Sequence, residues 1–176
     1  MATTYNLIAS NTVGSGGASS VTFSSIPQTG YTDLVVKATT RDTVAGPNNG
    51  PVLMKFNGSA TSDYSFRQLT GTGTTTGSQN NNTIAYVDVA LGSAGDSAGN
   101  TASTFTNIET YIPNYTSANY KSFSVDMVGE DNGSAAYSGL IAGLRSNTAA
   151  ITSITMTANT LFAQYSTFYL YGIKNS

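Results

Sequence analysis

The stretch Ser122-Phe123-Ser124-Val125-Asp126-Met127 alternates a polar with an apolar side chain at every step. Successive side chains of a β-strand point to opposite faces, so this period of two predicts a strand with one buried and one solvated face. Phe123, Val125 and Met127 are then expected in a core, and Asp126 is expected to face solvent.

The same alternation recurs on both sides of this stretch. It predicts further strands whose core-facing residues are Val21 and Phe23, Leu34 and Val36, and Ala85, Val87, Val89 and Leu91. Residues 135–145 also favour a strand over a helix, because Gly139 and Gly143 interrupt any helical stripe. In the segment from Phe168 to Ile173 the side chains expected on either face of a strand are apolar or aromatic. This pattern predicts a central strand buried on both faces.

Polar segments separate the predicted strands. Gly46 to Pro51 is typical of a turn, and the composition of Gly71 to Asn82 and of Gly92 to Ala102 predicts two long loops. Asp131-Asn132-Gly133 indicates a hairpin turn, with Glu130 and Asp131 solvated at its tip. Roughly ten to eleven short strands divided by such turns are typical of a sandwich or barrel.

We therefore predict an all-β fold, an antiparallel and jelly-roll-like β-sandwich that forms a single domain over residues 1–176. The first strand (Tyr5 to Ser10) and the last (Ser166 to Ile173) are both apolar enough to lie inside one sheet. If they pair, the pairing closes the sandwich.

Charge is scarce in this chain. Charged residues make up 9% of it, whereas an average domain has about 25%. Seven Lys and Arg residues and a net charge of −2 cannot form the basic face that nucleic acids require, and no apolar run approaches the roughly 20 residues of a membrane span. We expect no nucleic-acid partner, no membrane association and no signal peptide. Sheet edges usually carry charges as a guard, so these edges are expected to be covered by polar loops or by partner subunits.

The chain contains few residues of the types that usually carry out catalysis. Histidine and cysteine are absent, which excludes Ser-His-Asp and Cys-His sites, disulfides and most zinc sites. A glycosidase pair remains conceivable, because Glu109 and Asp126 lie on strands that follow one another. Exposed strand carboxylates are the simpler interpretation, and we predict that the protein is not an enzyme.

No cofactor or metal is expected either. The segment from Asp96 to Asn100 offers oxygen atoms to calcium but lacks the carboxylate density of a dedicated site. The Gly14 to Gly17 segment has neither the spacing of a phosphate-binding loop nor a helix after it.

Tyrosine is the enriched candidate for contact with a partner, at 11 residues with no tryptophan. Tyr offers rigid, amphipathic contact area and is favoured at interfaces. A ring that caps the core is the simpler alternative for each Tyr, and an intrachain or solvated side chain is the simpler alternative for each Arg. The candidate contact residues are Arg41, Asn48, Tyr64, Arg67, Tyr115 and Tyr120.

Several segments resemble virion proteins of tailed bacteriophages. They are VTFSSIPQTGYTDLVVKATTRD (residues 21–42), MKFNGSATSDYSFRQLTGTG (54–73), YIPNYTSANYKSFSVD (111–126) and the region 138–175, of which FAQYSTFYLYGIKN (162–175) is the most specific part. Members of this family look like small β-sandwiches that decorate capsids or form modules of tail fibres. The resemblance rests on strand and turn patterning, so it supplies no catalytic or binding residue.

The resemblance implies a non-enzymatic virion structural protein, foremost a capsid decoration, cement or knob protein on the outside of a tailed-phage head. Its implied partners are the major capsid protein or other virion proteins and further copies of itself as a homo-oligomer, on a particle assembled in the host cytoplasm. One alternative is a tail-fibre or spike adsorption module that binds host surface glycans. A second is a free-standing carbohydrate-binding protein.

Overall fold

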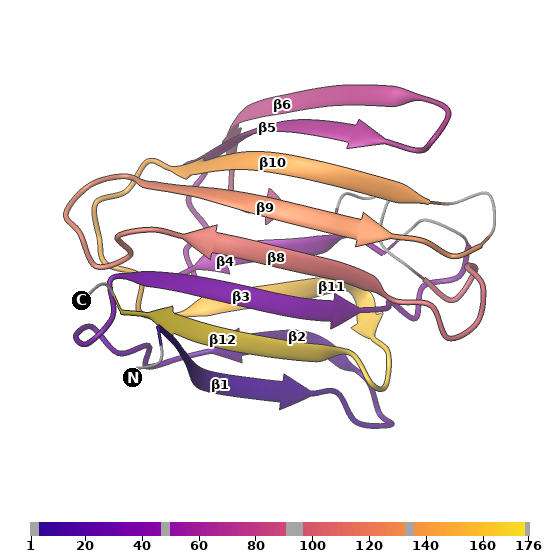
Figure 1. The fold of residues 1–176 in the computed structure, drawn as a ribbon, viewed down its shortest axis with the longest axis horizontal. Helices are drawn as coiled ribbons and strands as arrows, with labels where there is room; N and C mark the ends of the chain where they lie inside the picture. Colours follow the sequence, from indigo (N-terminus) through magenta and orange to yellow (C-terminus); the bar gives the residue numbers. More distant parts are fainter. Residues whose placement is uncertain (1–3, 47–49, 91–96, 133–135, 175–176) are drawn as a thin grey trace.

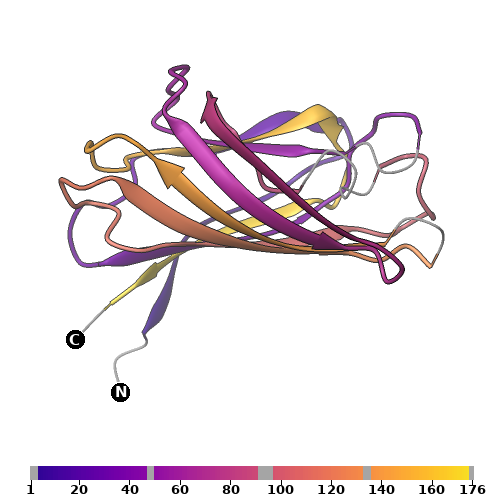
Figure 2. The same ribbon diagram turned by 90° about the horizontal axis from the view of Figure 1, so that it is seen from above.

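Two antiparallel sheets make up the structure, a computed structural model that describes residues 4–46, 50–90, 97–132 and 136–174 (Figure 1). Within these ranges the protein has twelve strands and no helix. The larger sheet has eight strands in the order β1-β12-β3-β8-β9-β10-β5-β6, and the smaller has four in the order β2-β11-β4-β7. Figure 2 shows the two sheets as stacked layers. The predicted all-β sandwich is therefore confirmed.

The strand bounds are as follows. The eight-stranded sheet holds β1 (Tyr5–Thr12), β3 (Asp33–Thr40), β5 (Tyr64–Gly71), β6 (Thr76–Ile84), β8 (Thr106–Ile112), β9 (Lys121–Gly129), β10 (Tyr137–Arg145) and β12 (Thr167–Ile173). The four-stranded sheet holds β2 (Ala18–Phe23), β4 (Val52–Phe56), β7 (Val87–Asp88) and β11 (Ile154–Phe162).

The core lies between the sheets and follows the period-two pattern of the sequence. In β9 every second residue from Lys121 to Gly129 is buried and the residues between them are exposed, as the alternation predicts. Aromatic side chains from both sheets meet edge-on in this core, with ring centroids 5.3 Å apart for Phe56 and Phe123 and 4.8 Å for Phe162 and Phe168. Edge-to-face contacts of this kind add to the free energy gained from burial.

The first and last strands pair as predicted. Tyr5 lies opposite Ile173 and Thr12 opposite Thr167 in an antiparallel β1–β12 pair. The order β1-β12-β3-β8 in one sheet and β2-β11-β4-β7 in the other alternates strands from early and late in the chain. This strand order is compatible with the predicted jelly roll, which stays a prediction.

Two inserted hairpins widen the larger sheet. β9 and β10 form one hairpin, β5 and β6 form the other, and β10 pairs with β5 so that both extend the sheet beyond β8. The four outermost strands beyond β8 are thus supplied by these hairpins. They give the sheet a broad outer face, directed away from the smaller sheet (Figure 1).

The predicted loop from Gly71 to Asn82 is wrong. Most of it is β6, whose residues from Thr76 to Thr83 are all exposed. Because β6 is an edge strand with both faces in water, it carries no apolar alternation for a sequence pattern to detect. The other predicted loop falls partly on residues 91–96, outside the described residues; its described part, 97–102, contains no strand.

Two further predictions need correction. The outer face of β12 is only partly buried: Phe168 and Leu170 point into the core, whereas on the outer face Tyr169 and Tyr171 are half-buried and Ile173 is buried. β12 also lies next to the edge strand β1 rather than at the centre of the sheet. Asp131 is 4% exposed, not solvated, because the Asn100 side-chain amide donates a 3.0 Å hydrogen bond to its carboxylate. β9 and β10 pair as an antiparallel hairpin, as the signal at Asp131 to Gly133 predicts, and Asn132 has a φ of 53°. Gly133 lies outside the described residues.

Candidate functional site

On the outer face of the eight-stranded sheet, the type of side chain changes from one strand to the next. Strand register aligns one row of outward residues across seven strands, from β12 to β6. Directly opposed neighbours in this row change from aromatic to charged, then to apolar, then to small and polar. The row reads Tyr169, Lys37, Glu109, Asp126, Leu140, Leu69 and Ser78.

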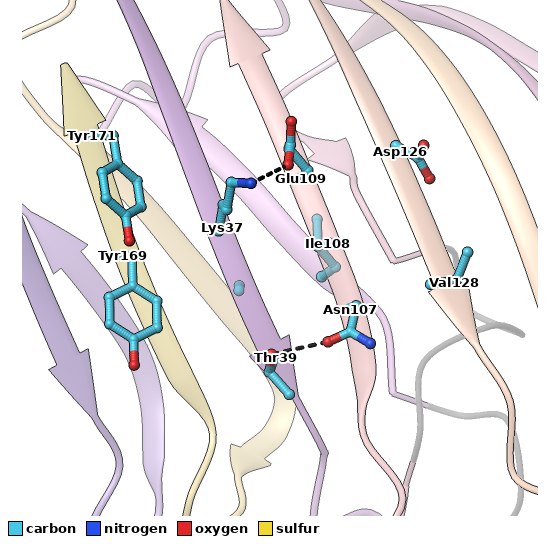
Figure 3. Close-up of a pocket in the computed structure, with 10 residues that line it drawn as sticks. Lys37, Thr39, Asn107, Ile108, Glu109, Asp126, Val128, Tyr169 and Tyr171 are labelled. Carbon is cyan, nitrogen blue, oxygen red and sulfur yellow. Dashed lines mark hydrogen bonds and ion pairs between the residues drawn. The ribbon is translucent and has the colours of Figure 1, made fainter. Parts of the chain in front are cut away.

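The first part of this row lines a depression of about 480 Å³, which we call the polar depression (Figure 3). The ammonium of Lys37 lies 2.7 Å from a carboxylate oxygen of Glu109, and both side chains are about half exposed. This hydrogen bond with Glu109 raises the pKa of Lys37 above its ordinary value. Beside the ion pair, the Thr39 hydroxyl donates a 3.0 Å hydrogen bond to the side-chain oxygen of Asn107.

Two aromatic rings flank the polar groups. Tyr169 and Tyr171 lie on β12 with their ring centroids 6.4 Å apart and their planes inclined by 29°. Tyr5 from β1 meets Tyr171 edge-on at 6.4 Å. Aromatic surface beside hydrogen-bonding groups suits an amphipathic ligand with one apolar face and several polar groups.

Glu109 and Asp126 are neighbours, as the sequence predicts, and are directly opposed across β8 and β9. Asp126 faces solvent, also as predicted. Figure 3 shows the Glu109 carboxylate joined to Lys37, away from Asp126. Both carboxylates are exposed to water, whereas the general acid of a glycosidase works from a desolvated position. The arrangement supports exposed strand carboxylates better than a hydrolytic pair.

A second depression lies further along the same face, over β9, β10, β5 and β6. Small side chains at Ser124 and Ala142 leave it open, and Leu69 and Leu140 border it. Leu69 is 64% exposed, Leu140 59% and Val128 45%. Leu69 opposes Leu140 directly, and Val128 lies diagonally from Leu140 across β9 and β10. We call Leu69, Val128 and Leu140 the outer-face patch; neighbouring exposed apolar side chains of this kind mark interaction surfaces.

Sequence reasoning missed this patch, although a signal for it exists. Met127 and Val128 are consecutive apolar residues in one strand, and so are Leu140 and Ile141. Because successive side chains point to opposite faces, one residue of each pair has to face outward.

The prediction that Tyr64 and Tyr115 contact a partner at the surface is wrong, because both side chains are buried. Tyr64 is 1% exposed and Tyr115 is 0% exposed. The Tyr64 hydroxyl accepts a 2.7 Å hydrogen bond from the backbone N–H of Phe56, and the Tyr115 hydroxyl donates to the carbonyl of Pro27. A backbone partner inside the fold lets each hydroxyl leave water. Burial raises the pKa of both phenols.

The remaining candidates differ in their surroundings. Arg41 donates from its guanidinium to the carbonyls of Asn100, Thr101 and Thr104, which gives it an intrachain role. Arg67 is exposed at the border of the second depression and donates to the side-chain oxygen of Asn82 at 2.8 Å. Tyr120 is 58% exposed just before β9. Asn48 lies outside the described residues.

Metal-binding groups do not gather in the described part of the chain. No cluster of three or more Asp, Glu, His or Cys residues occurs there. In the segment first considered for calcium, Asp96 is not described, and the Asn100 side-chain oxygen accepts hydrogen bonds from the Ser97 backbone and hydroxyl. None of the described residues belongs to a helix long and apolar enough to cross a membrane.

Comparisons with known proteins give no family. No family model matches the chain, and neither a curated protein nor a solved structure does so.

Proposed function

We propose that this chain is a non-enzymatic structural subunit of a virion, foremost a decoration, cement or knob protein on the outside of a tailed-phage head. The observation that carries the proposal is the outer-face patch of Leu69, Val128 and Leu140 on a broad, exposed sheet. The bacteriophage setting comes from the resemblance of residues 21–42, 54–73 and 138–175 to virion proteins.

The patch suits docking onto a large protein surface. The centre of an interface is more apolar than its polar rim, and a few desolvated central side chains supply most of the binding free energy while the residues around them exclude water. Ser78, Ser138 and Asn80 supply such a border on the same sheet. With only 9% charged residues, many copies on one shell repel each other little. The major capsid protein is the proposed partner.

The experiment mixes purified protein with phage heads that lack it and measures bound copies per head. We expect saturable binding in many copies, weakened at least tenfold by Leu140→Ser. Leu7→Ser is the matched control, since Leu7 is 55% exposed at the opposite edge of the same sheet. Failure to bind heads, together with absence from purified virions, overturns the proposal.

A second candidate is a tail-fibre or spike module that binds host surface glycans, and the polar depression favours it. Tyr169 and Tyr171 offer apolar ring faces, and Lys37, Glu109 and Asn107 offer hydrogen bonds to hydroxyl groups (Figure 3). A glycan array compares the native chain with Tyr169→Ala and with the control Tyr165→Ala, since Tyr165 is 69% exposed and does not line the depression. Saturable binding lost only in Tyr169→Ala, with few copies per virion, favours this candidate. The same binding by a chain absent from virions favours a free-standing carbohydrate-binding protein.

A further inference from the structure

Among the residues that the structure describes, nothing gives the edge strand β6 the usual protection of a sheet edge. It pairs with β5 on one side and ends the eight-stranded sheet on the other. Its nine residues, Thr-Gly-Ser-Gln-Asn-Asn-Asn-Thr-Ile, include no charged residue and no proline. Natural proteins normally place such residues, or a covering loop, on a long exposed edge to prevent pairing with another chain. An unprotected edge of this length is a template for a further strand.

The turn between β5 and β6 shows which backbone N–H and C=O groups of β6 point away from β5. Thr72 donates its N–H to the carbonyl of Thr75 at 2.9 Å, across a two-residue turn that begins with Gly73 at a φ of +86°. Hydrogen-bonded and non-hydrogen-bonded pairs alternate along an antiparallel ladder. Counting from this pair, Gly77, Gln79 and Asn81 bond to β5. Thr76, Ser78 and Asn80 therefore direct their N–H and C=O groups outward.

At the end of β6 away from the hairpin turn, the side chain of Asn81 occupies backbone N–H groups of the strand. The register shifts between Tyr64 and Phe66, where β6 bulges. The side-chain oxygen of Asn81 accepts hydrogen bonds from the backbone N–H of Asn82 and of Thr83. The regular part of the edge thus runs from Thr76 to Asn81, with Ser78 central among its three outward residues.

We propose that a second copy of this chain pairs with β6 through its own β6, antiparallel about a twofold axis at Ser78. In this register Ser78 opposes Ser78 of the second copy, and Thr76 opposes Asn80. All three positions are outward on both strands, so each opposed pair exchanges two backbone hydrogen bonds. On the other face Gly77 opposes Gln79, which brings no bulky or charged side chains together.

Self-complementarity is the argument for a second copy as the occupant. A twofold axis requires one surface to match itself, and a strand of small polar residues without charge does so without repulsion. The opposite edge, β1, is less suited because its register is interrupted between Leu7 and Ala9. Pairing of β6 with β1 of another molecule would be head-to-tail and would give open chains rather than a dimer.

The dimer would join two eight-stranded sheets into one continuous sheet. A twofold axis at a hydrogen-bonded pair stands perpendicular to the sheet, so both outer faces point the same way. Leu69 opposes Ser78 across β5 and β6, so the two outer-face patches lie on either side of the new junction. This inference extends the proposed function by naming how copies join; its test uses the purified chain alone and is independent of head binding.

Cysteine cross-linking tests the register directly, because the chain contains no cysteine. Ser78→Cys is expected to form a disulfide-linked dimer on mild oxidation. Thr76→Cys and Asn80→Cys are expected to cross-link efficiently only when the two variants are mixed. Ser122→Cys, an exposed position on β9, gives the rate of random collision. The proposal is overturned if Ser78→Cys reacts no faster than Ser122→Cys, or if mixing Thr76→Cys with Asn80→Cys brings no gain.

A backbone variant provides the second test. The N–H of Ser78 points outward, so Ser78→Pro removes no hydrogen bond to β5, and proline is tolerated on such an edge. Sedimentation should show a concentration-dependent dimer for the native chain and for Ser78→Thr, and a monomer for Ser78→Pro. The melting temperature of Ser78→Pro should equal that of the native chain at concentrations where the native chain is also monomeric. A native chain that stays monomeric at every concentration, or that forms open-ended oligomers, contradicts the twofold pairing.

Discussion

Lys121 and Arg145 lie directly opposite each other across β9 and β10, and both are buried, at 1% and 3% exposure. Arg145 forms a 3.3 Å ion pair with Asp63. The Lys121 ammonium donates to the carbonyls of Ser117 and Asn119 at 2.6 and 2.5 Å. Burial, and then repulsion from Arg145, lower the pKa of Lys121. Two buried cations therefore lie side by side, and the carboxylate of Asp63 pairs with Arg145.

Asp63→Asn should destabilise the protein by about 3–5 kcal/mol, because removing one partner of a buried pair leaves the other charge uncompensated. Lys121→Met should cost much less, since it removes a second cation that is itself unfavourable next to Arg145. Urea unfolding measures both variants. Equal losses for the two substitutions would show that the charges are not coupled in this way.

The pH dependence of Lys121 gives a check on the same cluster. Its pKa is lower in the folded state than the ordinary value of 10.5, so between these two values the unfolded chain binds more protons. The free energy of unfolding should therefore gain a rising contribution as the pH increases through this window. The stability difference between Lys121→Met and the native chain should change in that window and be constant at neutral pH.

Alkaline conditions should destabilise the fold through its buried tyrosines. Burial raises the pKa of Tyr64 above 10.0, so above pH 10 the unfolded chain releases a proton that the folded chain retains. The contribution is complete below pH 10 and falls by up to about 1.4 kcal/mol per pH unit as the pH rises toward the raised pKa. Unfolding from pH 8 to 11 should show a smaller decline for Tyr64→Phe. An equal decline in both proteins would assign the effect to other groups.

Gly143→Ala should destabilise the core by about 1–3 kcal/mol through overpacking. A Cβ at Gly143 would lie 2.3 Å from ring carbons of Phe123, which already packs edge-on against Phe56. Gly14→Ala is the matched control, because nothing lies within 4 Å of its added Cβ, and it should change stability by no more than about 0.5 kcal/mol. Thermal unfolding separates the two, and a neutral Gly143→Ala would show that Phe123 can move aside.

Arg41→Met should loosen the segment from Asn100 to Thr104. Its guanidinium donates to three carbonyls there, and charge-assisted hydrogen bonds each contribute about 1.5–3 kcal/mol. Hydrogen exchange should become faster in this segment for Arg41→Met and remain unchanged for Arg67→Met. Unchanged exchange in Arg41→Met would return Arg41 to the set of partner-contact candidates.

Period-two alternation was sufficient to predict β9, the burial of Val21 and Leu34, and the sandwich itself. Alternation reports one buried face, so it could not detect β6, which has none. The burial of Tyr64 and Tyr115 depends on backbone partners at Phe56 and Pro27 that only the folded chain brings near. The carboxylate neighbours Glu109 and Asp126 were predictable from consecutive strands, but the engagement of Glu109 with Lys37 required the β3–β8 pairing.

The pairing of β1 with β12 has a mechanical consequence. Tyr5 and Ile173 are opposed at the end of this pair where both chain ends leave the sheet (Figure 1). Tension between the two ends would break the hydrogen bonds at this end of the β1–β12 pair first. The remaining hydrogen bonds of the pair would then break one after another, because the force would not act on all of them at the same time. If the chain is the virion subunit proposed above, attachment through its sheet face would avoid this direction of force and would resist pulling better than tethering by its termini.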